Sequence, residues 1–151
     1  MASRVNLSDP RTGLSFFYNV SEHVGPRPTI GVARTPSHEK VMKNSPDDVM
    51  LVQFFLRQIC DASVERLPEP TGSFDVYTGF WIYYQQDLFG YDPDGIVTPA
   101  RGLNYNEYSN YFIVRLNETF LEMKGKAAFE AIPSRPELRP TLRASLKSSA
   151  P

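Results

Sequence analysis

The sequence predicts a mostly α-helical protein with a small three-helix core, an extended N-terminal arm with room for a short strand, and a C-terminal tail. Three observations predict this fold class. Apolar residues recur at helical spacing in three segments between residues 45 and 125. Hydrophobic residues make up 41% of the chain and charged residues 22%, which allows a packed core. The 13 prolines indicate many extended connections. We therefore expect an arm over residues 1–44, a helical domain over 45–125 and a tail over 126–151.

The arm contains a segment rich in strand-forming residues, LSFFYNVSEHV at 14–24, which lies between Gly13 and Gly25. Such composition between two glycines predicts a strand or an extended arm. Residues 25–43 contain three prolines and are expected to form a loop.

The first helix is expected over residues 47–59. Ser45 suits the N-cap, Pro46 the first helical position, and the acidic Asp47 and Asp48 the positive end of the helix dipole. One apolar stripe at helical spacing is formed by Val49, Val52, Leu56 and Ile59.

Two further helices are expected after the prolines of 65–72. One runs from about Asp75 to Asp87, and tight turns follow it over 89–102. The other begins near Asn104, where Asn104 and Glu107 have the spacing of a capping box, and ends at Gly125. Its apolar face consists of Tyr105, Tyr108, Phe112, Leu116, Phe120 and Met123.

Apolar residues also occur on the sides of these helices that should face water. Met50 and Phe54 lie opposite the apolar stripe of the first helix, and Phe80 and Tyr83 lie off the Trp81/Ile82 face of the second. Clustered exposed aromatic residues are typical of interfaces. We expect this surface to be covered, either by the chain's own N-terminal arm or by another protein subunit.

The tail carries a ladder of basic residues at every fourth position, Arg135, Arg139, Arg143 and Lys147, beside Leu138, Leu142 and Leu146. Pro136 and Pro140 argue against one continuous helix. Two interpretations remain open: a solvated or docked tail, or a surface that contacts nucleic acid or another acidic partner. The three arginines are therefore candidate partner-binding residues.

The overall charge favours neither nucleic acid nor an anionic membrane as a partner, because the net charge is −1 and the pI about 6.1. No apolar run is long enough for a membrane span, and the N-terminus has no apolar signal region, so we expect synthesis in the cytoplasm without a signal peptide. Cys60, the one cysteine, allows no intrachain disulfide and is expected to be a small buried residue. His23 and His38 have no partner in a recognisable catalytic motif. We therefore expect no catalytic residues, no metal site and no cofactor.

The turns between these helices carry a recognisable pattern. The first helix has V-x-x-V-Q-x-x-L, which includes Gln53, and the following segment has G-x-F-x-x-x-T over residues 72–78. Trp81, Ile82 and Gln86 come next, and Asp94-Gly95 follows with IVTP. In this order and spacing the segment 45–102 resembles the peptidoglycan-binding-like domain, a small three-helix module attached to many cell-wall hydrolases. The sequence departs from that family at Thr71, Asp75 and Gln85, where the family prefers Asp, Gly and an aromatic residue.

Gln53 and Gln86 are expected to connect loop backbone to a helix, since a buried amide offers two donors and an acceptor; sugar contact is the alternative. Two functions follow. The first is a non-catalytic structural or adaptor subunit of a large assembly, for which we expect a bacteriophage particle, because a wall-type module without export signal or catalytic domain needs a carrier. The second, implied by the resemblance, is recognition of peptidoglycan. A polar and aromatic groove would favour the second function, and exposed aromatic residues would favour the first.

Overall fold

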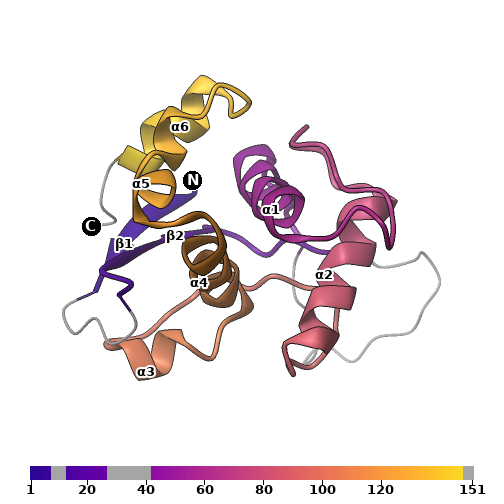
Figure 1. Cartoon of the computed structure of the whole chain (residues 1–151), viewed down its shortest axis with the longest axis horizontal. Helices are drawn as coiled ribbons and strands as arrows, with labels where there is room; N and C mark the ends of the chain where they lie inside the picture. The colour runs from indigo at the N-terminus through magenta and orange to yellow at the C-terminus, as the bar shows by residue number, and fades with distance from the viewer. Residues whose placement is uncertain (8–12, 27–41, 148–151) are drawn as a thin grey trace.

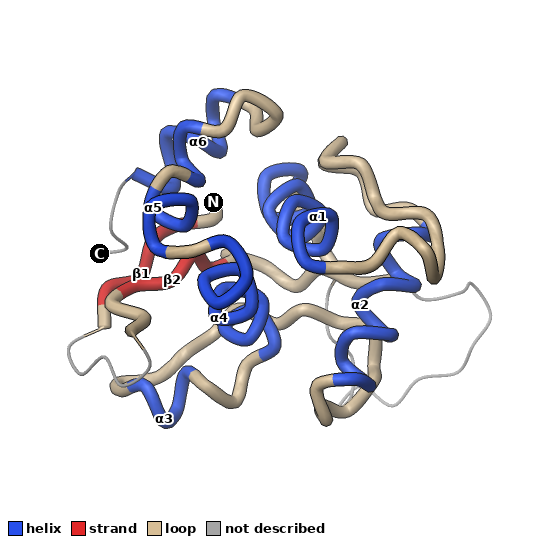
Figure 2. The backbone as a smooth tube through the Cα atoms, in the orientation of Figure 1, coloured by secondary structure: helices blue, strands red, loops and turns tan. Residues whose placement is uncertain are grey.

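The computed structural model describes residues 1–7, 13–26 and 42–147. Over these residues the chain is mostly helical with a small antiparallel sheet, which confirms the predicted fold class at that level (Figures 1 and 2). The elements in chain order are β1 (Ser3–Asn6), β2 (Phe16–Asn19), α1 (Pro46–Ile59), α2 (Val76–Leu88), α3 (Tyr105–Tyr108), α4 (Phe112–Lys124), α5 (Lys126–Glu130), a 3-10 turn (Ile132–Ser134) and α6 (Pro140–Lys147).

α1 lies at the centre of the described structure and packs against α2, α4 and α6 (Figure 1). Pro46 occupies its first turn together with two acidic residues, as predicted. Ser45 stands at the N-cap, but its side chain makes no capping hydrogen bond. Every residue from Asp48 to Leu56 is buried, so the helix has no side that faces water over these two turns. A helix that is apolar all round is typical of such a central position.

The long helix predicted from Asn104 onward is instead two helices, α3 and α4, separated by a turn at 109–111. Asn104 caps α3 as predicted, because its Oδ1 accepts the N–H of Glu107 at 3.1 Å. A contact with a distant residue accompanies the break. In a continuous helix the carbonyl of Ser109 would accept from the backbone four residues on, but it accepts the hydroxyl of Tyr91 at 3.2 Å. Gly125, at φ 91°, ends α4 as predicted.

The N-terminal arm contributes to the core through its strand. β2 lies within the predicted segment 14–24 and pairs antiparallel with β1, with Ser3 opposite Asn19 and Asn6 opposite Phe16. The sheet packs against α4 through β2 and against α6 through β1. The described buried residues form one cluster that runs from Ala2 to Leu146, so all three predicted ranges of the chain supply side chains to it. Residues 8–12 and 27–41, which include most of the predicted loop and His38, lie outside the described residues.

The described part of the tail is docked on this core. Leu138, Leu142 and Leu146 are at most 1% exposed, because their four-residue spacing places them on one side of the chain. α6 begins at Pro140, so the predicted interruption by proline is correct. Burial of three leucines stabilises this docking by about 1.5–3 kcal/mol each.

The two glutamines of the recognised pattern connect loops to helices, as predicted. Gln53 on α1 donates to the carbonyl of Ser73 at 2.8 Å and to Thr78 Oγ1 at 3.0 Å, and it accepts the N–H of Gly72 at 2.9 Å. Gln86 on α2 repeats this arrangement one loop later: it donates to the carbonyl of Ile96 and accepts the N–H of Gly95, both at 2.9 Å. Both glycines have positive φ, so each amide supports a turn that other residue types rarely form.

Buried asparagines connect segments that are distant in sequence. Asn19 forms two hydrogen bonds with the backbone of Ala100, and Asn117 bonds both the N–H and the carbonyl of Tyr18. Each side-chain amide thus makes the pair of hydrogen bonds that a neighbouring strand would make. This satisfies backbone groups that would otherwise be buried without partners. The bonds of Asn19 fix Ala100 against β2, and those of Asn117 fix β2 against α4.

Candidate functional site

Met50 and Phe54, predicted as partner-binding residues on an outer face of α1, are 5% and 1% exposed. The ring of Phe54 lies against Phe120, with centroids 5.8 Å apart, and the guanidinium of Arg135 lies 5.3 Å from its centre. The backbone N–H of Arg139 approaches the sulfur of Met50 at 3.3 Å. The cover is therefore α4 and the C-terminal segment, rather than the N-terminal arm or another subunit. Neither residue is exposed for a partner in this structure.

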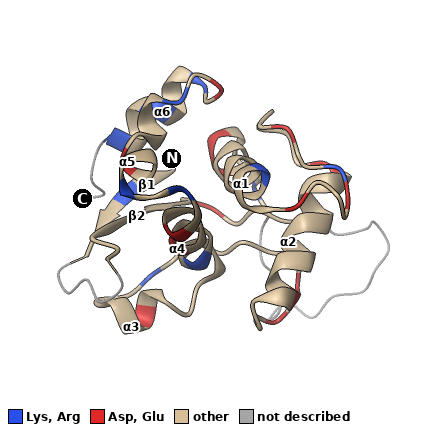
Figure 3. Cartoon of the chain, viewed as in Figure 1, with Lys and Arg blue, Asp and Glu red and all other residues tan. Residues whose placement is uncertain are grey.

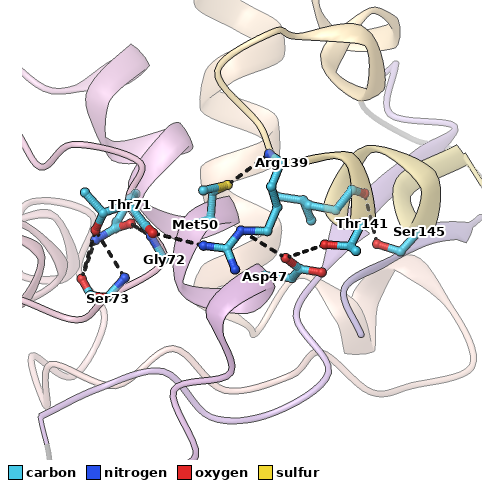
Figure 4. Close-up of polar contacts among 10 residues, drawn as sticks. Asp47, Met50, Thr71, Gly72, Ser73, Arg139, Thr141 and Ser145 are labelled. Carbon is cyan, nitrogen blue, oxygen red and sulfur yellow. Dashed lines mark hydrogen bonds and ion pairs between the residues drawn. The ribbon is translucent and has the colours of Figure 1, made fainter.

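Arg139 connects three parts of the chain (Figure 4). Its Nη2 donates to the carbonyl of Thr71 at 3.0 Å, and its Nε lies 3.6 Å from Oδ1 of Asp47, which also accepts the hydroxyl of Thr141 at 3.2 Å. Gly72 lies directly against this guanidinium: a Cβ there would collide with Nη2. Arg139 thus holds the tail on α1 and on the loop before α2, which makes it a structural residue of the tail.

The other two arginines of the ladder have different surroundings. Arg135 forms an ion pair with Glu137, Nε to Oε1 at 2.6 Å, in addition to its contact with the ring of Phe54. Arg143 lies on α6, and its Nε is buried without a hydrogen-bond partner among the described residues. The ladder therefore does not present three equivalent cations to a partner, because two of its members already hold contacts within the chain.

Phe80 and Tyr83 remain exposed, at 37% and 54%. Together with Val76, which is 75% exposed, they follow one line along α2 at spacings of four and three residues. The opposite side of α2 is buried and carries Thr78, Trp81, Ile82, Gln85 and Gln86. The helix thus carries large apolar side chains on both sides, and one of these sides faces solvent. We call the exposed side, formed by Val76, Phe80 and Tyr83, the outer face of α2.

A shallow groove of about 540 Å³ runs beside this face. Its apolar floor includes Phe74, whose ring lies 3.3 Å from where a Cβ of Gly79 would be. This glycine, the fourth residue of α2, thereby admits an aromatic ring close to the helix backbone. The lining residues are Pro26, Phe74, Asp75, Val76, Gly79, Phe80, Tyr83, Asp94 and Gly95.

The aromatic side chain of Phe80 is held in place by its neighbours. Its ring stacks on Tyr84, with centroids 5.6 Å apart, and meets the ring of Trp81 edge-on at 5.2 Å. Trp81 is itself fixed, because it is fully buried and its indole N–H donates to the carbonyl of Arg66 at 2.9 Å. A rigid exposed aromatic loses little conformational entropy on binding, which is a property of interface hot spots.

A second candidate site lies at the end of α2, where two hollows of about 310 and 490 Å³ share Tyr91 and Asn110. Aromatic rings of Phe89, Tyr91 and Tyr111 line it beside polar groups of Asn110 and Arg115. The guanidinium of Arg115 lies 4.8 Å from the centre of the Phe89 ring. Burial, and to a lesser degree the charge of Glu118, raises the pKa of Tyr91, so its hydroxyl remains protonated and donates to Ser109. We call this site the Tyr91 cleft.

Groups that could perform chemistry are sparse in the described part of the chain. No group of three or more His, Cys, Asp or Glu residues there could hold a metal ion. Burial raises the pKa of Cys60 to about 12, although the amide of Gln85 at 3.2 Å opposes this, so the thiol is a poor nucleophile at neutral pH. No helix of residues 1–7, 13–26 and 42–147 is long and apolar enough to cross a membrane.

Comparison with protein-family models, curated proteins and solved structures gave no match to this chain. The candidate sites therefore depend on geometry alone. Sequence reasoning identified Phe80 and Tyr83 but missed the groove beside them and the Tyr91 cleft. One signal was present for the groove: the second helix has aromatic residues on every side and a glycine near its start.

Proposed function

We propose that this protein is a non-catalytic structural or adaptor subunit of a large assembly, and that it docks through the outer face of α2. The observation that carries the proposal is the pair Phe80 and Tyr83, exposed on a helix whose other side is already buried in the core. An exposed apolar face of this kind is typical of protein interfaces. A bacteriophage particle is the assembly we propose.

The module itself is proposed to be of the peptidoglycan-binding-like kind. What supports this is the pairing of each pattern glutamine with a loop glycine, Gln53 with Gly72 and Gln86 with Gly95. In both cases the residues that carry the resemblance perform the same task, which is to hold a turn against a helix.

The experiment compares the native chain with the double variant Phe80→Ser/Tyr83→Ser, each expressed in the native cell and separated by size. We expect the native chain to travel with a large particle and the double variant to travel as a free chain. Met123→Ser is the matched control, because Met123 is a 55% exposed apolar residue on a different helix. Co-migration of the double variant with the particle would contradict the proposal.

Peptidoglycan recognition is the second candidate function, and the Tyr91 cleft favours it. Aromatic rings beside amide and guanidinium groups suit a ligand with both apolar faces and polar substituents. We expect Asn110→Ala/Arg115→Ala to abolish co-sedimentation with purified peptidoglycan if the cleft performs this function, whereas Phe80→Ser/Tyr83→Ser should leave it unchanged. Absence of co-sedimentation by the native chain would refute this candidate.

The absence of catalysis is also part of the proposal, supported by the raised pKa of Cys60. Incubation of the chain with purified peptidoglycan should release no muropeptides. Release that persisted through stringent purification and was abolished by a point substitution would show an enzyme.

A further inference from the structure

The groove beside the outer face of α2 is lined by acidic rather than basic residues. Its described lining contains two carboxylates, Asp75 and Asp94, and no cation. Figure 3 shows α2 almost free of charged residues. Its single charged side chain is that of Asp87, which lies four residues beyond Tyr83 and therefore on the same side of the helix. Three acidic residues therefore accompany the exposed aromatic residues.

Two of these carboxylates, Asp75 and Asp87, retain capacity for a partner, whereas Oδ1 of Asp94 already accepts hydrogen bonds from the amide of Gln86 and the N–H of Ile96. Asp75 caps α2 through one oxygen, since Oδ1 accepts both the N–H and the hydroxyl of Thr78. Its Oδ2 has no hydrogen-bond partner among the described residues, and Asp87 forms no ion pair among them. Arg66 contacts α2 but lies over the ring of Tyr77, 5.2 Å from its centre and outside the groove lining.

We infer that the occupant of this groove is a basic, apolar segment of a protein partner, in which Lys or Arg side chains flank the apolar ones. This inference rests on the proposed docking function of α2 and adds the chemistry of the partner. Apolar side chains of the segment contact Phe74, Phe80 and Tyr83, and its cations pair with Asp75 and Asp87. A second copy of the same face is disfavoured as the occupant, because the acidic residues beside the two faces would repel each other.

The test uses the purified full chain and two synthetic helical peptides of about 14 residues, which is about four helical turns. One peptide has Leu along one face and Lys elsewhere, and the other has Glu in place of every Lys. Binding is followed by calorimetry and by the fluorescence of Trp81, the one tryptophan, whose ring contacts that of Phe80. We expect the Lys peptide to bind at least tenfold more tightly than the Glu peptide, with an affinity that falls as salt is added.

Two sets of variants assign this preference to the groove. Tyr83→Ser should weaken binding of the Lys peptide at least fivefold, and it leaves the stacked rings of Phe80, Trp81 and Tyr84 in place; Met123→Ser is the control. Asp75→Asn/Asp87→Asn should reduce the preference for the Lys peptide to less than twofold. Asn at position 75 still caps the helix, so the fold is retained.

Equal binding of the two peptides, or a preference that survives the aspartate substitutions, would overturn the inference. Self-association that Tyr83→Ser abolishes would make a second copy the occupant. A tenfold gain in peptide affinity on replacement of residues 27–41 by a Gly-Ser linker would assign the groove to the chain's own segment. If the native particle depends on Phe80 and Tyr83 while the peptides show no charge preference, the docking function stands and the inferred partner chemistry is wrong.

Discussion

Replacement of Gln53 by Leu tests whether the pattern glutamines hold the fold. Leucine keeps much of the buried volume but removes three hydrogen bonds. Two of the lost contacts are replaced easily: Ser73 is exposed, so its carbonyl can bond water, and the hydroxyl of Thr78 keeps Asp75 at 2.6 Å. The N–H of Gly72 is buried and loses its acceptor. An unpaired buried donor costs about 1–3 kcal/mol.

For a chain of this size that cost corresponds to a fall in Tm of about 2–12 °C, since 1 kcal/mol shifts Tm by about 2–4 °C. The assay is thermal unfolding followed by circular dichroism. Gln58→Leu is the matched control, because Gln58 lies on the same helix and its side chain makes no hydrogen bond among the described residues. Gln86→Leu should lower Tm as Gln53→Leu does, since it removes the acceptor of the buried Gly95 N–H in the same way. Equal Tm values for Gln53→Leu and Gln58→Leu would refute the structural role, and lost peptidoglycan binding at unchanged Tm would show a ligand role instead.

Three further predictions concern the rest of the molecule. Gly72→Ala should destabilise the protein by about 2–3 kcal/mol in urea unfolding, since the added Cβ would crowd the backbone carbonyl of Pro46 at 3.0 Å and displace the guanidinium of Arg139, in addition to the cost of a positive φ. Gly90→Ala, at φ +80° with open space around it, should cost only about 1 kcal/mol, and equal costs would show that the crowding at Gly72 is relieved without cost. Burial raises the pKa of Asp48 above its ordinary 3.8 despite hydrogen bonds from Ser21 and Glu22, so the folded state holds the proton more tightly than the unfolded state. The stability of the native protein relative to Asp48→Asn should therefore fall as pH rises above about 4. A relative stability that rises with pH would mean that the hydrogen bonds outweigh burial. Cys60 should react with a disulfide reagent at pH 8 on the order of 100- to 1,000-fold more slowly in the folded than in the unfolded chain, and equal rates would show that the thiol is open to solvent.

Local sequence signals predicted the elements whose determinants are close in the chain. Pro46 and the two aspartates after it mark the start of α1, and Gly125 marks the end of α4. The helix predicted from Asp75 is present as α2, one residue displaced, because Asp75 caps it. The roles of Gln53 and Gln86 were also predictable, since a polar residue within an apolar helix must satisfy its amide nearby.

Contacts between distant residues were not predictable in this way. Met50 and Arg139 are 89 positions apart, and nothing near Met50 in the sequence indicates that the tail returns to cover it. The turn between α3 and α4 accepts a hydrogen bond from the hydroxyl of Tyr91, 18 positions before its acceptor Ser109. The tail itself was ambiguous, because leucines and arginines at four-residue spacing suit both a docked segment and an exposed basic surface.

α1 and α2 share one sequence feature, apolar residues on all sides, but differ in what surrounds them. On α1 the second side is buried by Phe120, Arg135 and Arg139, so its apolar character is explained within the chain. On α2 the second side leaves Tyr83 54% exposed and Val76 75% exposed, although burial of one such aromatic side chain is worth about 1.5–3 kcal/mol. Selection for stability alone favours polar residues on a face that stays in water, so the aromatic residues of α2 are best explained by a contact that the free chain does not make. For this reason the search for a partner should begin at Phe80 and Tyr83, and Met50, Phe54 and the arginine ladder should serve as controls for stability.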